Sequence, residues 1–79
     1  MAHMLSLPDE VRFIDLYGMP YYIYWENLSI GASFFLPTTA TPAQVDKALT
    51  AAKKHLNFGF AVRARREFGR HGVRVWRIY

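Results

Sequence analysis

Basic side chains are concentrated at the C-terminal end of the chain, and a tryptophan lies among them. Residues 63–79 hold six of the ten lysines and arginines, together with Trp76. Guanidinium groups neutralise phosphates, and an aromatic ring beside them can stack on bases. The sequence therefore predicts a nucleic-acid surface, with DNA favoured over RNA. Its expected contact residues are Arg63, Arg65, Arg70, His71, Arg74, Trp76 and Arg77, flanked by Lys53 and Lys54.

The same side chains also allow a solvated surface that binds nothing. In this alternative Glu67 pairs with Arg74, and Arg65 stacks on Trp76 in a cation–π contact worth about 0.5–1 kcal/mol. The two interpretations differ in whether the arginines find their partners inside the chain or on a ligand.

The basic stretch has the pattern of a β-hairpin. Gly69 and Gly72 bracket Arg70 and His71, and the flanking runs alternate apolar with charged residues. Glycines around a dipeptide between two alternating runs are typical of a strand, a tight turn and a second strand. We therefore expect a two-residue loop at residues 70–71.

Because side chains alternate between the two faces of a strand, this register separates an apolar face from a basic face. The apolar face, expected to pack on a helix, holds Phe58, Phe60, Val62, Ala64, Phe68, Val73 and Val75. The basic face holds Arg63, Arg65, Arg74 and Trp76. Phe68 pairs with Val73 in this register. Arg66 and Arg77 fall on the apolar face, where a structural role is their alternative.

A helix is predicted over residues 42–56. Thr41 is followed three residues later by Gln44, as in a capping box, and Pro42 suits the first helical position. Apolar residues then recur at helical spacing on one face: Val45, Ala48, Leu49, Ala52 and Leu56. Asn57 or Gly59 is expected to end the helix.

Shorter strands are expected before the helix. Residues 32–36 form one between Gly31 and Pro37, and residues 11–17 and 21–25 form two more. Residues 8–11 allow a short helical turn instead. The predicted fold is α+β, with one helix packed on an antiparallel sheet in the order β-β-β-α-β-β and a C-terminal β-hairpin.

An aromatic run in residues 17–25 suggests a second surface. Most of it is expected to be core, yet alternation leaves Tyr22 and Tyr24 exposed as candidate partner-binding residues. The alternative function is therefore a protein-binding module. A homodimer through the strand edge of residues 21–25 or of residues 73–79 is compatible with either function.

Other chemistry finds little support in the sequence. The chain has no cysteine, and His55 and His71 have no third ligand at metal-site spacing. No serine has a base at a recognisable spacing, and the glycines form no phosphate loop. We expect no enzyme, no metal and no cofactor.

Length and charge narrow the class of protein. The chain has 79 residues, 52% of them hydrophobic, and a net charge of +4. Residues 1–3 are typical of a vector-derived scar, and residues 4–79 are expected to form a single small domain. The positive charge favours an acidic partner. No stretch looks able to span a membrane, and we expect a cytoplasmic protein.

Two further stretches carry a family resemblance. Residues 26–37 combine Leu28, Gly31 and the run Ser-Phe-Phe-Leu-Pro, and residues 72–78 read Gly-Val-Arg-Val-Trp-Arg-Ile. Together they resemble a group of small, mostly uncharacterised bacteriophage and prophage proteins. The resemblance covers residues 26–79 and implies expression in the cytoplasm of a bacterial host. It also implies binding to nucleic acid or to a host protein. If the partner is a host protein, the chain would be a phage effector that inhibits a host enzyme or defence protein.

Overall fold

The computed structural model describes residues 7–79, so the predicted scar lies outside the described residues. The elements, in chain order, are α1 (Asp9–Arg12), β1 (Phe13–Leu16), β2 (Met19–Tyr22), the 3-10 helix η1 (Trp25–Asn27), β3 (Ser33–Pro37), α2 (Pro42–Ala48), α3 (Thr50–Leu56), β4 (Phe60–Glu67) and β5 (Arg70–Arg77).

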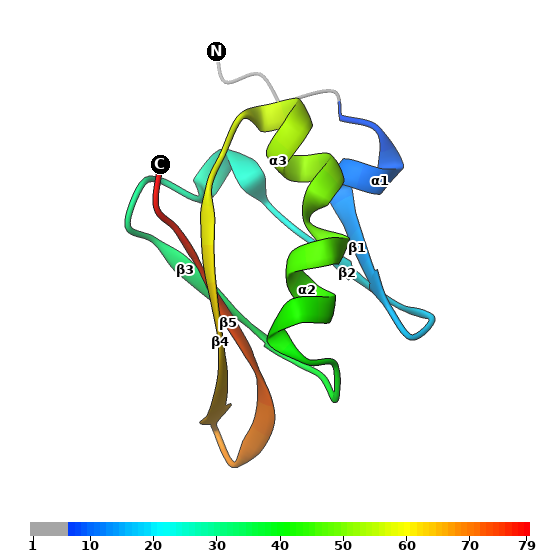
Figure 1. The fold of residues 1–79 in the computed structure, drawn as a ribbon, viewed down its shortest axis with the longest axis vertical. Coiled ribbons are helices and arrows are strands. Elements are labelled where there is room, and N and C mark those ends of the chain that lie inside the picture. Colours follow the sequence, from blue (N-terminus) through cyan, green and yellow to red (C-terminus); the bar gives the residue numbers. More distant parts are fainter. Residues whose placement is uncertain (1–6) are drawn as a thin grey trace.

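The fold is α+β, as predicted, but it has two antiparallel sheets instead of one. Within residues 7–79, β3, β5 and β4 form a three-stranded sheet in that order, and β1 pairs only with β2. Figure 1 shows α2 and α3 on one face of the larger sheet, between it and the β1–β2 hairpin. Val73 and Val75 of the central strand point to this side and are fully buried with Val45 and Leu49.

The first segment differs from the expected pair of long strands. The alternative helical turn forms as α1, and the strands shrink to residues 13–16 and 19–22. Their turn consists of Tyr17 and Gly18, at φ 55° and 77°, the positive values that a type I′ hairpin turn requires. The sequence did not predict this turn, because its first central residue is a tyrosine, whereas asparagine, aspartate or glycine is usual at that position.

Residues 23–26 anchor the segment in the core instead of extending a strand. The Trp25 ring is buried, and its Nε1 donates a hydrogen bond to the carbonyl of Val11 at 2.7 Å. Arg12 is also buried and donates to both carboxylate oxygens of Glu26 at 2.8 and 2.6 Å and to the Ile23 carbonyl at 2.9 Å. The buried guanidinium is therefore paired and hydrogen-bonded, as burial of a charge requires.

The predicted helix divides into two. Thr41 and Gln44 form the capping box, with reciprocal side-chain-to-backbone hydrogen bonds of 3.2 and 2.8 Å. Leu49 separates α2 from α3, and its ψ of −1° departs from the helical value while its side chain stays fully buried. Asn57 ends α3 in the left-handed conformation at φ 59°, which confirms the first of the two expected end points.

The turn of the C-terminal hairpin is not where the glycines indicated. It consists of Phe68 and Gly69, at φ 53° and 72°, and Glu67 pairs with Arg70 across it. Val73 consequently pairs with Ala64, four residues from the expected partner. Because this displacement is even, Val62 and Val75 still face the helices. Phe68 does not, since it lies at the tip and is 89% exposed.

Gly72 belongs to β5 and serves strand packing instead of the turn. A Cβ atom at this position would lie 2.3 Å from the Leu36 carbonyl oxygen and 2.5 Å from Cζ of Phe35. Glycine is therefore required because a neighbouring strand and an aromatic ring approach the backbone closely. Gly69 therefore belongs to the turn and Gly72 to the strand, whereas the sequence pattern predicted that both flank one loop.

Candidate nucleic-acid interface

The candidate site is the sheet face opposite the helices, which we call the outer face. Within residues 7–79, no helix lies over it (Figure 1). Strand alternation and the pairing register place on it Ser33, Phe35 and Pro37 of β3, Ala61, Arg63, Arg65 and Glu67 of β4, and Arg70, Gly72, Arg74 and Trp76 of β5. The four residues predicted for the basic face therefore lie together.

Arg74 is held by partners within the chain. Its Nε and Nη2 donate to the two carboxylate oxygens of Glu67 at 2.6 Å each, and Nη1 donates to Ser33 Oγ at 2.8 Å. These hydrogen bonds raise the pKa of Arg74 and lower the pKa of Glu67 from their ordinary values. This is the pairing that the solvated-surface alternative proposed, so Arg74 is committed to structure while Glu67 is ionised.

Arg65 contacts residues within the chain, but its side chain is also exposed to solvent. Its guanidinium lies 5.8 Å from the centre of the Trp76 ring and 3.8 Å from a Glu67 carboxylate that is already paired with Arg74. Half of its side chain is exposed. The expected cation–π contact is therefore present, and the charge remains accessible from solvent.

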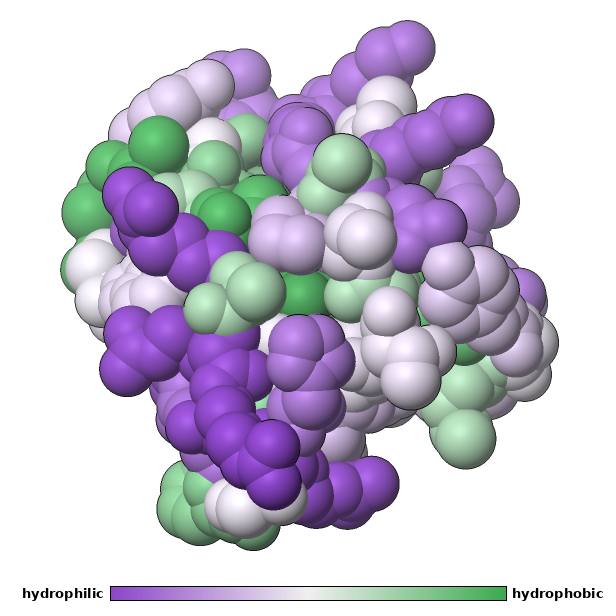
Figure 2. Space-filling model, turned by 60° about the horizontal axis from the view of Figure 1, so that its bottom comes forward, coloured by the Kyte–Doolittle hydropathy of each residue, from purple (hydrophilic) through white to green (hydrophobic). Residues whose placement is uncertain are grey.

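Three more arginines on the hairpin are exposed and make no internal ion pair. Arg63, Arg66 and Arg70 form no salt bridge with any of residues 7–79. Arg63 and Arg70 lie on the outer face, whereas Arg66 points to the other side of the hairpin tip, as His71 does. Figure 2, which brings this end of the molecule forward, shows hydrophilic residues gathered beside hydrophobic ones.

Two aromatic rings lie among these charges. Trp76 and Phe35 are both half-buried, and they are diagonal neighbours, because Trp76 pairs with Ser33 and Phe35 pairs with Arg74. Sequence reasoning missed Phe35. The signal was the Phe-Phe pair, since alternation must place one ring on each face, and Phe34 lies inside against Trp25 at 6.0 Å between ring centres.

A shallow apolar hollow of about 390 Å³ adjoins Trp76 on the outer face. Ile30, Ala61 and Ile78 line it together with Arg63. An apolar surface next to a tryptophan and an arginine suits the flat face of a base together with its phosphate.

Other predicted contact residues lie elsewhere. Arg77 donates to the carbonyls of Leu28 and Tyr79 at 2.9 and 3.1 Å and stacks on Phe58, with 3.5 Å from the guanidinium to the ring centre. It has the structural role that its position in the apolar pattern suggested.

The two lysines lie behind the sheet. Lys53 pairs with Asp46, and both Lys53 and Lys54 belong to α3, which packs on the opposite side from the outer face. They therefore do not flank the outer-face arginines as expected.

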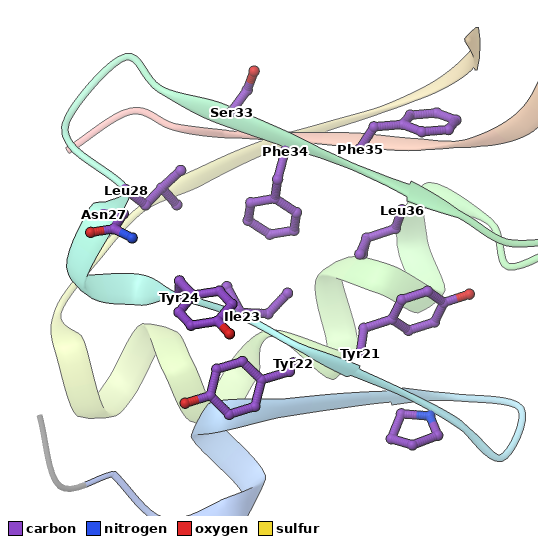
Figure 3. A pocket seen from close by; sticks show the side chains of 11 residues that line it. Tyr21, Tyr22, Ile23, Tyr24, Asn27, Leu28, Ser33, Phe34, Phe35 and Leu36 are labelled. Atoms are coloured by element: carbon purple, nitrogen blue, oxygen red, sulfur yellow. The ribbon is translucent and has the colours of Figure 1, made fainter. Parts of the chain in front are cut away.

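The predicted partner-binding tyrosines border a different feature. Tyr22 and Tyr24 are 40% and 60% exposed, and their rings meet edge to face at 4.7 Å. They line a groove of about 530 Å³ between residues 20–24 and β3 (Figure 3). Figure 3 shows Phe34 pointing into this groove, whereas Phe35 points away from it.

Comparison of the chain with protein-family models, with curated proteins and with solved structures gave no match. The resemblance to small bacteriophage proteins therefore stays a prediction. No helix within residues 7–79 combines the length and apolar character needed to cross a membrane.

Proposed function

We propose that the outer face binds single-stranded nucleic acid, with little sequence preference and without catalysis, in a bacterial cytoplasm. One observation carries the proposal. Arg63, Arg65 and Arg70 share with two neighbouring aromatic rings, Trp76 and Phe35, a sheet face that the helices leave uncovered. Stacking platforms beside a positively charged path are the usual means of binding single strands without reading their sequence.

The two rings favour single strands over duplexes. Trp76 and Phe35 can each stack on a base only if that base is unpaired, because paired bases in a duplex present their edges and not their faces. A duplex would gain the phosphate contacts alone.

The arginines determine how the affinity depends on salt. Arg63, Arg65 and Arg70 are the outer-face guanidinium groups that can each neutralise a phosphate, since Arg74 and Arg77 are committed within the chain and Arg66 points to the other side. Three contacts to a single strand give a slope of log K against log salt concentration of about −2.

The proposal is tested by fluorescence anisotropy with a labelled mixed-sequence oligonucleotide, single-stranded and duplex, at about 50 and 200 mM salt. Arg63→Gln with Arg65→Gln is expected to weaken binding strongly and to flatten the salt dependence. Lys47→Gln with Lys54→Gln removes the same charge from the helical side and is expected to have little effect. Equal losses in both double variants would show that binding follows net charge and not the outer face.

A specific observation favours a second candidate function, binding to another protein. The rings of Phe13, Tyr22 and Tyr24 form a chain of edge-to-face contacts at 5.2 and 4.7 Å, and all three are at least 40% exposed. Exposed tyrosines are enriched at binding hot spots. Tyr22→Ala with Tyr24→Ala should then abolish capture of a bacterial protein while leaving oligonucleotide affinity unchanged. If the double variant still captured the bacterial protein but lost affinity for the oligonucleotide, this candidate would be excluded.

A further inference from the structure

Within residues 7–79, β3 is an edge strand of the larger sheet, and alternate backbone groups along it point away from β5. Arg77 donates to the Ala32 carbonyl at 2.9 Å and accepts from the Gly31 N–H at 2.8 Å, which fixes the hydrogen-bonding side of the ladder. By antiparallel alternation, the N–H and C=O groups of Ser33 and Phe35 point away from β5. The Pro37 carbonyl does so as well, and it accepts a hydrogen bond from the Tyr21 hydroxyl at 2.6 Å.

This edge lacks the features that normally prevent strands from pairing. Native sheets protect their edges with charged side chains, proline or bulges. The opposite edge of the same sheet, β4, carries Arg63, Arg65 and Arg66, and β2 contains Pro20. β3 reads Ser-Phe-Phe-Leu-Pro, without a charge and with its proline at the last position. The sheet therefore has one protected edge and one edge that is open to pairing.

We propose that the protein is a homodimer in which the β3 strands of two copies pair antiparallel about a two-fold axis at Phe35. In this register the two Phe35 residues exchange two N–H to C=O hydrogen bonds. Each Ser33 N–H donates to the Pro37 carbonyl of the other copy, whose second lone pair is available beside the Tyr21 hydroxyl. The missing N–H of Pro37 falls at the end of the ladder, so the edge is complementary to itself.

The charge distribution permits this association despite the net charge of +4. The sheet order β3-β5-β4 places the exposed arginines of β4 two strands from the axis. At about 4.8 Å per strand, the two β4 strands of a six-stranded sheet would lie about 24 Å apart. That distance exceeds the Debye length of about 10 Å at 0.1 M salt, so their repulsion is screened.

The sheet order also bears on which strand edge a dimer can use. Both edges of β5 are occupied, by β3 and by β4, so a dimer through residues 73–79 is excluded. Pairing at β3 instead joins the two outer faces and brings the second copy to the groove beside Tyr22 and Tyr24.

The dimer is tested by sedimentation equilibrium from about 1 µM to 1 mM, without nucleic acid, so that the result does not depend on the proposed function. The wild-type chain is expected to be a dimer. Phe35→Lys and Phe35→Glu should each be monomeric, because like charges would lie directly opposite each other at the axis. Mixed at equal amounts, the two variants should form a one-to-one heterodimer, which misfolded chains could not do.

Phe68→Lys is the matched control, because it makes the same change at the 89% exposed hairpin tip and should leave the dimer intact. A wild-type monomer at 1 mM would overturn the proposal and leave the β3 edge to a strand of another protein. Dimers that persist in both Phe35 variants would also overturn it.

Discussion

Arg74 and Glu67 form a two-point ion pair on the outer face, with both donor–acceptor distances at 2.6 Å. The hairpin from β4 to β5 carries six arginines and this single acid. This carboxylate therefore decides whether Arg74 is committed within the chain. Loss of the Glu67 charge should therefore both weaken the sheet and leave the Arg74 guanidinium available to a ligand.

The stability of the protein should depend on pH through Glu67. Its pKa is lowered in the folded state by the hydrogen bonds from Arg74, so the unfolded chain binds more protons in the window between the folded and the unfolded pKa. The contribution is fully present above the unfolded value of about 4.3 and is lost as pH falls through the folded value. Thermal unfolding between pH 7 and pH 2 should show a smaller acid-induced loss of Tm in Glu67→Gln. Parallel curves for the two proteins would contradict this.

Removing the acid should strengthen binding to nucleic acid. Glu67→Gln frees Arg74 and removes the carboxylate 3.8 Å from Arg65. One additional phosphate contact would steepen the salt slope with single strands by about 0.7. Anisotropy titrations at three salt concentrations measure both changes. An unchanged slope and affinity would mean that Arg74 contributes nothing to the ligand.

The Trp76 ring should contribute to binding single strands but not duplexes. Trp76→Ala is expected to cost about 1–3 kcal/mol for the base that stacks on it, which corresponds to about 5- to 150-fold in Kd. Phe68→Ala removes an exposed ring from the hairpin tip and serves as the control. Equal weakening for single strands and duplexes would argue against stacking.

Gly72→Ala should destabilise the protein, because the added Cβ would lie 2.3 Å from the Leu36 carbonyl oxygen. Overpacking of this kind typically costs about 1–3 kcal/mol. Urea unfolding measures this difference in the free energy of unfolding, provided that the variant and the wild type have the same m-value. A free energy of unfolding equal to that of the wild type would show that β3 and β5 are not packed as described.

Local rules predicted the elements that depend on local chemistry. Thr41 and Gln44 marked the helix start, because a capping box uses only residues three apart. The faces of the hairpin strands were predicted correctly except at Phe68, although the turn was misplaced, since the error in register was an even number of residues.

The features that the sequence did not predict depend on contacts between residues distant in sequence or on unusual turns. Tyr17 and Phe68 adopt positive φ, which such residues rarely do, so neither turn could be recognised. Whether Arg74 would be paired or free depended on the position of Glu67 across the hairpin. Phe35 joined the outer face through pairing with a strand 39 residues away, at Arg74.

Binding at the outer face can be followed directly by NMR titration with a single-stranded oligonucleotide, using the two tryptophan indole N–H signals. Trp76 lies on the outer face, whereas Trp25 is buried and bonded to the Val11 carbonyl, which makes it an internal reference. We predict that the Trp76 signal shifts with added oligonucleotide while the Trp25 signal stays in place. Binding that leaves the Trp76 signal unmoved, or no binding at about 50 mM salt, would show that the outer face is not a nucleic-acid surface.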